Sequence, residues 1–223
     1  IFTSDNGPTA NQYAKPFRGT KYVTFEGGHR VPFIFHWPAE INRGSVLEVP
    51  INAMDVFPTL SEIIEVAIPQ DRTCDGVSLM PLLVGRPLKR QCEQPFFYYN
   101  CENLQAVRMS DWKLHLPREP KQLPFWDKNK AFVGIKRPVL YNLRTDREET
   151  SDVASANPEI VQEMLELAES TRRELGEYMQ RGSGQRRTGS VVPGAPVISH
   201  EKDWGMVAPA TAETIARERQ ERH

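Results

Sequence analysis

Phe96-Phe97-Tyr98-Tyr99 begins a series of short β-prone runs that continues with Gln105 to Met109 and Trp112 to Leu116. These runs are rich in aromatic and branched residues, and turn residues separate them, as is typical of neighbouring strands in one sheet. A fourth run, Val139 to Leu143, follows after a longer connection. The sequence therefore predicts a small four-stranded antiparallel sheet.

The segment after this sheet predicts a long amphipathic helix. Asn157 is a favourable N-cap and Pro158 is favourable at the first helical position. Apolar residues then recur mostly at helical spacing, which predicts one buried face; they are Val161, Met164, Leu165, Ala168, Leu175 and Met179. We expect this helix to pack on the sheet.

The first 90 residues show a different, mixed pattern. Ile1 to Thr3 and residues 31–38 have the composition of short strands, and the dense turn signal Ser4 to Pro8 follows the first of them. A helix is predicted after Asp55, which caps it directly or through a close neighbour, with Pro58 tolerated in the first turn. Its expected buried face consists of Leu60, Ile63, Ile64 and Ala67.

These patterns give an α/β (α+β) fold class and three segments. Residues 1–90 are expected to complete a mixed α/β domain, residues 91–182 to form the small domain of antiparallel sheet and helix, and residues 183–223 to be an extended or disordered tail, with a frayed helix at 211–220. Because the chain opens on what resembles the end of a strand, we expect the native protein to continue upstream.

Composition excludes some classes of partner. The 223 residues carry a net charge of −1 and are 39% hydrophobic, so the basic excess typical of proteins that bind nucleic acid or anionic membranes is missing. No apolar run has the length of a membrane span. The three cysteines, Cys74, Cys92 and Cys101, include no C-x-x-C pair, so they do not predict a zinc site, and their redox state stays open.

Two short segments carry candidate chemistry. Asp5 and Asn6 place two hard oxygen donors side by side in a turn, the kind that Ca²⁺ or Mg²⁺ prefers, although an ordinary Asx-turn explains the same residues. Lys21 precedes a glycine-rich stretch, and it is either a cation for a negatively charged substrate or a solvated surface lysine. Glu26 and Arg30, four residues apart, are candidates to pair with each other.

Taken together and in order, the motifs resemble the sulfatase family, the arylsulfatase group in particular, over residues 1 to about 180. The motifs that carry the resemblance are Thr3-Ser4-Asp5-Asn6-Gly7-Pro8, Gly19-Thr20-Lys21, Phe25-Glu26-Gly27-Gly28-His29-Arg30-Val31-Pro32, His36-Trp37-Pro38, Asp55 to Leu60, Asp75 to Leu79, Val107-Arg108, Trp112-Lys113-Leu114, and Leu140 to Leu143 with Asp146, Glu148 and Glu149 following.

The resemblance implies the C-terminal portion of a sulfuric ester hydrolase with an alkaline-phosphatase-like fold. It places Asp5 and Asn6 as ligands of a Ca²⁺ ion, with Mg²⁺ less expected, and Lys21 as the catalytic and substrate-binding cation. Glu26, Gly27, Gly28 and Arg30 become scaffold, and His29 has no role. The family's nucleophile, a formylglycine made within a C/S-x-P-S-R motif, is absent from this sequence. It is therefore expected upstream, and the isolated chain is expected to be inactive.

Other functions stay open at this point. One is a phosphate-ester hydrolase or transferase of the same superfamily, and another is a non-catalytic relative that binds sulfated glycans. The expected partner is a small-molecule or glycan sulfate ester. The connection at residues 117–138, with Lys121, Trp126, Lys128 and Lys130, is either a solvated loop or a contact for an anionic sugar. The resemblance implies a lysosomal, secreted or periplasmic location, and the oligomeric state is open.

Overall fold

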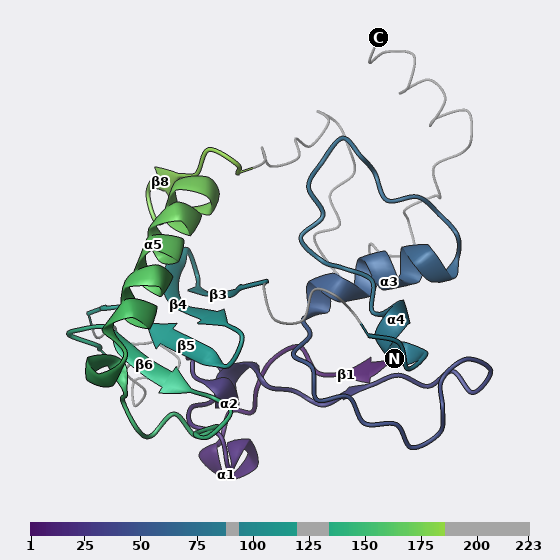
Figure 1. Ribbon diagram of the computed structural model, residues 1–223, viewed down its shortest axis with the longest axis horizontal. Coiled ribbons are helices and arrows are strands. Elements are labelled where there is room, and N and C mark those ends of the chain that lie inside the picture. Colours follow the sequence, from purple (N-terminus) through teal and green to yellow (C-terminus); the bar gives the residue numbers. More distant parts are fainter. Residues whose placement is uncertain (88–93, 120–133, 186–223) are drawn as a thin grey trace, which may run out of the picture. The chain divides into compact units, whose positions relative to one another are not determined.

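In the computed structural model, residues 1–87, 94–119 and 134–185 are described. The predicted sheet is present, with strand order β3-β4-β5-β6 and antiparallel pairing throughout (Figure 1). Its strands are β3 (Phe96–Asn100), β4 (Asn103–Met109), β5 (Trp112–His115) and β6 (Val139–Asn142). Each strand lies within one or two residues of its predicted run, so this prediction is confirmed.

Helix α5 (Pro158–Leu175) packs on the sheet as predicted, making its contacts with β4 (Figure 1). Met164 and Ala168 are fully buried, together with sheet residues Val107, Leu114 and Leu140. The short 3₁₀ turn η2 (Ala154–Ala156) precedes the helix.

Two details at the ends of α5 differ from the prediction. Asn157 stands at the N-cap, but its amide donates to the carbonyl of Val153 (2.9 Å) and makes no capping bond to the helix. The helix ends at Gly176, whose φ of 84° favours glycine, so Met179 lies beyond it in the turn between β7 (Gly176–Glu177) and β8 (Gln180–Arg181). Met179 is 85% exposed; its assignment to the buried helical face is wrong because the glycine breaks the period.

The second face of the sheet is also covered. Strand residues point alternately to opposite faces, so Leu114 faces α5 whereas its neighbours Lys113 and His115 face the other way. There the segment before α2 (Glu26–His29) contributes Phe25, which stacks on the His115 ring with centroids 4.4 Å apart. A second apolar cluster lies on this face, consisting of Phe25, Ile135, Tyr141 and Leu143. The sheet is thus the middle layer of three.

The remaining N-terminal elements are short. They are β1 (Phe2–Thr3), which pairs antiparallel with β2 (Phe33–Ile34), α1 (Asn11–Ala14), the 3₁₀ turn η1 (Ala53–Asp55), α3 (Val56–Ile63) and α4 (Met80–Leu83). The predicted side-chain cap of α3 is absent, because Asp55 stands at the N-cap of α3 without a capping bond. The capping box lies one turn earlier, at η1: Asn52 accepts from the Met54 amide, while the Asp55 carboxylate accepts from the Asn52 and Val77 amides, each at 2.9 Å.

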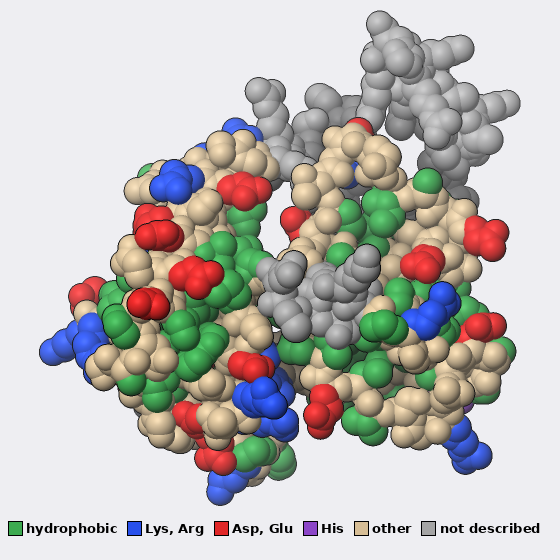
Figure 2. Space-filling model, in the orientation of Figure 1, with side chains coloured by type: hydrophobic (Ala, Val, Ile, Leu, Met, Phe, Trp, Pro, Cys, Tyr) green, Lys and Arg blue, Asp and Glu red, His purple; other side chains and the backbone are tan. Residues whose placement is uncertain are grey.

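The predicted buried face of α3 is wrong. Leu60 is 44% exposed and Ile64 65% exposed, whereas the buried helix residues are Pro58, Thr59 and Ser61. Helical spacing identifies an apolar face, but burial needs another element to cover it, and α3 packs against η1 and α4 on its other side. Apolar side chains accordingly reach the surface among polar ones in Figure 2.

Several predictions fall on residues outside the described ranges. They concern the tail from residue 186, the helix at 211–220, Cys92, and most of the 117–138 connection with its lysines and Trp126. Cys74 and Cys101 are free thiols. The proposed boundary near residue 90 stays a prediction. In the described residues, no helix combines the length and apolar character needed to cross a bilayer.

Candidate active site

The turn that carries Asp5 and Asn6 is fixed by backbone contacts with α2. The Gly7 amide donates to the Gly28 carbonyl at 3.0 Å. A Cβ on Gly7 would lie 2.1 Å from the Gly27 carbonyl oxygen, and a Cβ on Gly27 would lie 2.4 Å from the Gly19 carbonyl oxygen. No other residue type fits such close backbone approaches. The glycines therefore hold the Ser4–Gly7 turn against the glycine-rich stretch some 20 residues downstream.

Lys21 is connected to the same turn. Its amide donates to the carbonyl of Pro8 at 2.8 Å, two residues beyond Asn6. Lys21 is half-buried, and its ammonium lies 5.3 Å from the centroid of the Tyr22 ring, within the range of a cation–π contact. Asp5, Asn6 and Lys21 all line one broad cleft, and the backbone bond to Pro8 connects the segment of Lys21 with the turn that carries Asp5 and Asn6.

The donor set of the turn fits a hard cation in kind. Asp5 is exposed and Asn6 half-buried, and the Ser4 hydroxyl donates to the Asn6 carbonyl at 3.2 Å and lies 3.5 Å from Asp5 Oδ1. Ca²⁺ takes six to eight oxygen ligands, of which these two side chains offer a minority. Within residues 1–87, 94–119 and 134–185, no three His, Cys, Asp or Glu side chains lie close enough together to hold a metal. Further ligands would have to come from other segments.

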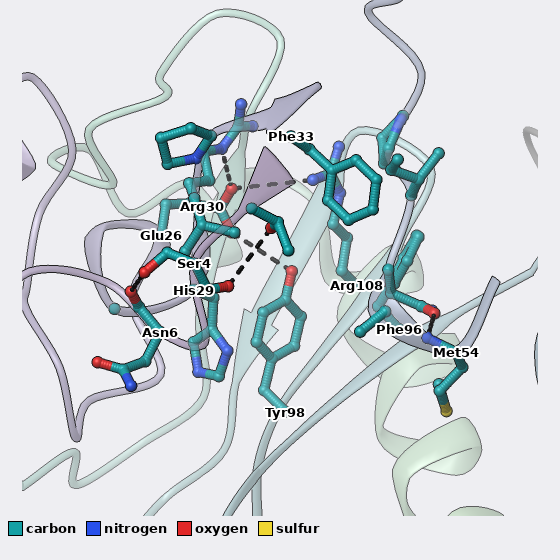
Figure 3. Close-up of a pocket in the computed structure, with 18 of the residues that line it drawn as sticks. Ser4, Asn6, Glu26, His29, Arg30, Phe33, Met54, Phe96, Tyr98 and Arg108 are labelled. Carbon is teal, nitrogen blue, oxygen red and sulfur yellow. Dashed lines mark hydrogen bonds and ion pairs between the residues drawn. The ribbon is translucent and has the colours of Figure 1, made fainter. Parts of the chain in front are cut away.

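Beneath the glycine stretch, Glu26 is the centre of a buried ionic cluster. It is 1% exposed, and its Oε1 accepts from the ammonium of Lys113 at 2.8 Å while its Oε2 accepts from Arg30 Nε at 2.5 Å. The Arg108 guanidinium lies 3.8 Å away and the Tyr98 hydroxyl donates to Oε1 at 3.4 Å. Figure 3 shows Glu26 with Arg30, Tyr98 and Arg108 at the cleft. The predicted Glu26–Arg30 pair is confirmed, as one part of a larger cluster.

Glu149 continues this cluster on its other side. Its Oε2 accepts from the Glu26 backbone amide at 2.6 Å, and its Oε1 lies 3.1 Å from the Lys113 ammonium and 2.7 Å from His115 Nε2. Lys113, His115 and Glu149 each have no exposed surface. One lysine thus bridges two carboxylates, and Glu149 binds the backbone amide in the first turn of α2. The sheet thereby holds the wall of the cleft through charge-assisted hydrogen bonds.

Burial and pairing shift the pKa values of these groups in opposite ways. Burial alone would raise the pKa of Glu26, but attraction and hydrogen bonding from Lys113, followed by Arg30, outweigh it and lower the pKa to about 2. Burial lowers the pKa of His115 to about 4 against the opposing bond to Glu149. At neutral pH His115 is therefore uncharged, donating through Nε2 to the Glu149 carboxylate, and its Nδ1 faces the Arg118 guanidinium at 3.4 Å.

Sequence reasoning missed the partners that this wall needs. No role was predicted for Lys113, His115 or Glu149. Lys113 and Glu149 bond to Glu26 across 87 and 123 sequence positions, and His115 joins the cluster through Glu149. The sequence signal was the alternation of Lys113 and His115 with Leu114 in a predicted strand, and the structure shows that both faces of this strand are covered. Charged and polar residues on a covered face require buried partners.

Comparison with known proteins places this arrangement in a family. A family model described as sulfatase matches residues 1–66, and one described as the C-terminal region of aryl-sulfatase matches residues 91–199. An N-acetylgalactosamine-6-O-sulfatase of Bacteroides thetaiotaomicron is 28% identical over 186 residues, covering 77% of this chain and 36% of the relative. Human arylsulfatase D is 43% identical over 97 residues, covering 41% of this chain and 16% of the relative.

Solved structures agree. One of them, from Bacteroides thetaiotaomicron and described with the metabolism of multiple glycosaminoglycans, superposes with a TM-score of 0.58 and 29% identity, covering 77% of this chain and 38% of the other. A Pseudoalteromonas sulfatase gives a TM-score of 0.61 and 25% identity, covering 76% and 35%. The chain thus spans well under half of the length of each of these relatives.

Proposed function

Because the chain belongs to the sulfatase family, we propose that it forms one wall of the active site of a sulfuric ester hydrolase. In this proposal Asp5 and Asn6 hold a divalent cation, Ca²⁺ by preference, and Lys21 contacts the sulfate ester. The observation that carries the proposal is the pair of backbone bonds Gly7–Gly28 and Lys21–Pro8, which connects the backbone segments that carry Asp5, Asn6 and Lys21.

The chemistry divides between the groups on this wall. A bound Ca²⁺ ion would neutralise charge on the sulfate and on the attacking oxygen. Asp5 and Asn6 contribute two oxygens to hold it, and the glycine contacts keep those oxygens in place. Lys21 stabilises the charge that builds on the leaving oxygen as the ester bond breaks. The nucleophile, a formylglycine in this family, would come from outside the 223 residues.

Family membership favours sulfate esters over the phosphate esters considered from the sequence. The names of the relatives include an N-acetylgalactosamine-6-O-sulfatase and a steryl-sulfatase, so we propose a sulfate ester of a sugar or of another cyclic alcohol as the substrate. A non-catalytic role in binding sulfated glycans would use the same wall, and kinetics on the complete protein distinguish the two.

The test is steady-state kinetics of the complete enzyme on an aryl sulfate. Lys21→Ala should lower kcat about a hundredfold and change KM less, since the lysine acts mainly on the transition state. Lys21→Arg should rescue poorly because a planar guanidinium does not replace a compact ammonium. Lys136→Ala, at an exposed lysine, is the control and should leave both constants unchanged.

The cation assignment has its own readout. Asp5→Ala should lower calcium binding measured by equilibrium dialysis as well as activity, because the cation loses a charged ligand. Unchanged calcium content with full activity would remove Asp5 from the site. Near wild-type kcat in both Lys21 variants would show that Lys21 is a surface residue.

A further inference from the structure

Tyr22 has a backbone conformation that its residue type disfavours. Its φ is 80°, in the left-handed region that glycine enters readily and that a bulky aromatic residue seldom occupies. Residues held in such conformations gather at active sites and ligand clamps, where the surrounding structure imposes them. Tyr22 directly follows Lys21, so the unfavourable conformation lies beside the proposed catalytic cation.

The surrounding structure fixes this conformation from two sides. The Lys21 amide is bonded to the Pro8 carbonyl, and the Tyr22 carbonyl accepts from the Asn100 side-chain amide of β3 at 2.5 Å. Both bonds use backbone atoms of the segment 21–22, which any residue type would supply. They account for the shape of the turn but give no reason for a tyrosine side chain at its tip.

The ring of Tyr22 has no core to fill. The residue is 38% exposed, and it lines the same cleft as Asp5, Asn6 and Lys21. The nearby charge is the Lys21 ammonium, 5.3 Å from the ring centroid. A sulfate ester of a cyclic alcohol combines an anionic group with an apolar or sugar ring face. An accessible aromatic surface next to a cation is complementary to both of these parts.

We propose that Tyr22 is a specificity-determining residue, whose ring contacts the cyclic alcohol part of the sulfate ester while Lys21 contacts the sulfate. The proposal rests on the proposed function and adds the residue that selects the substrate: Tyr22 favours esters whose alcohol carries a sugar or aryl ring over esters of open-chain alcohols. The ring also borders the Lys21 ammonium, so both halves of the substrate are recognised by neighbouring residues.

The left-handed backbone provides a variant that separates function from folding. Tyr22→Gly removes the ring and relieves the conformational strain, so the midpoint of thermal unfolding should stay the same or rise. Tyr22→Phe keeps the ring and is the matched control. The probes are p-nitrophenyl sulfate, which carries a ring, and n-hexyl sulfate, which does not.

In the complete enzyme we expect Tyr22→Gly to lower kcat/KM for p-nitrophenyl sulfate at least tenfold, mainly through KM, and to change kcat/KM for n-hexyl sulfate less than twofold. Tyr22→Phe should stay within twofold of wild type on both. Equal losses on the two esters, or no loss on the aryl ester, would overturn the specificity assignment.

Equilibrium binding keeps this inference separate from the proposed function. Dissociation constants of phenylmethanesulfonate, a ring-bearing analogue whose C–S bond replaces the hydrolysable ester bond, and of inorganic sulfate are compared for wild type and Tyr22→Gly, so that turnover plays no part. The inference requires that the variant weaken binding of the sulfonate at least tenfold relative to inorganic sulfate, and an unchanged ratio overturns it. A wild-type enzyme that binds the ester but never hydrolyses it would contradict the proposed function alone.

Discussion

The sheet with α5 and the segment around α3 follow the same sequence rules and end in opposite states. On α5, the apolar residues Met164 and Ala168 recur at helical spacing and are fully buried. On α3, Leu60 and the C-cap residue Ile64 recur at the same kind of spacing and are 44% and 65% exposed. The difference teaches that periodicity specifies which face of a helix is apolar, whereas burial depends on whether another element reaches that face.

The two regions also differ in how charge is used. Between the sheet and α2, a lysine with no exposed surface bridges two carboxylates at 2.8 and 3.1 Å. Around α3, the buried Asp55 carboxylate accepts hydrogen bonds from the backbone amides of Asn52 and Val77. The ionic cluster joins segments that are distant in sequence. Its loss should therefore cause the largest decrease in the free energy of unfolding among the substitutions considered.

Lys113→Met should destabilise the protein by about 3–5 kcal/mol. The substitution keeps a similar volume but leaves Glu26 and Glu149 buried without their shared cation, and removing one partner of a buried ion pair costs on this order. Urea unfolding at pH 7 measures the change, from the midpoint together with the slope.

The matched control is Lys136→Met, at an exposed lysine, where a change within about 0.5 kcal/mol is expected. A double variant Lys113→Met/Glu149→Gln should recover part of the loss, because one of the two uncompensated carboxylates is gone. A Lys113→Met loss no larger than that of the control would mean that the cluster contributes shape and no net electrostatic support.

Acidification should weaken the sheet region through His115. Its pKa is lowered by burial to about 4, against about 6.5 in an unfolded chain. Between pH 4 and 6.5 the unfolded state binds a proton at this histidine and the native state does not. The free energy of unfolding is therefore highest above pH 6.5 and falls by ~3 kcal/mol as the pH drops towards 4. Below about pH 4.5 the low pKa of Glu26 extends the loss towards pH 2.

His115→Gln should flatten the upper part of this pH dependence. Glutamine retains an amide donor for Glu149 but takes up no proton between pH 4 and 6.5. Free energies of unfolding at half-unit pH steps provide the measurement, with His36→Gln, at an exposed histidine, as the control that should keep the wild-type slope. An undiminished slope in His115→Gln would assign the acid sensitivity to other groups.

The contrast between the regions also shows how far sequence reasoning reaches. The strands and α5 were predictable because turn residues, an N-terminal proline and local periodicity are all encoded within a few positions of one another. The cluster of Glu26, Lys113 and Glu149 was not, because its hydrogen bonds join positions up to 123 apart. The left-handed backbone at Tyr22 was not either, since no glycine marks it and the restraint comes from distant Asn100.

For the candidate site, the sequence supplied Asp5, Asn6 and Lys21 and the structure supplied their common support. The motif order suggested that these residues belong together, and the structure adds a tertiary contact: Gly7 and Gly27 allow the backbones of the turn, α2 and the segment at Gly19 to approach closely. A short motif does not contain the residues that pack behind it. Here two of those residues, Lys113 and His115, come from the face of β5 that points away from α5.

The smallest expected effect is a substitution at the exposed C-cap of α3. Ile64→Ala should change the free energy of unfolding by no more than about 0.5 kcal/mol, because a residue 65% exposed loses little contact when shortened. Met164→Ala, on the buried face of α5, removes a comparable apolar side chain and should cost about 2–5 kcal/mol, since it leaves a cavity in a closed core.

Both substitutions are measured by urea unfolding of the 223-residue chain under one condition. If Ile64→Ala cost as much as Met164→Ala, the face of α3 would be covered in solution and the contrast between the two regions would fail; if both cost little, the core beneath α5 would be loosely packed. The expected outcome, a large loss at one helix and almost none at the other, ties the difference in burial to a measured difference in stability.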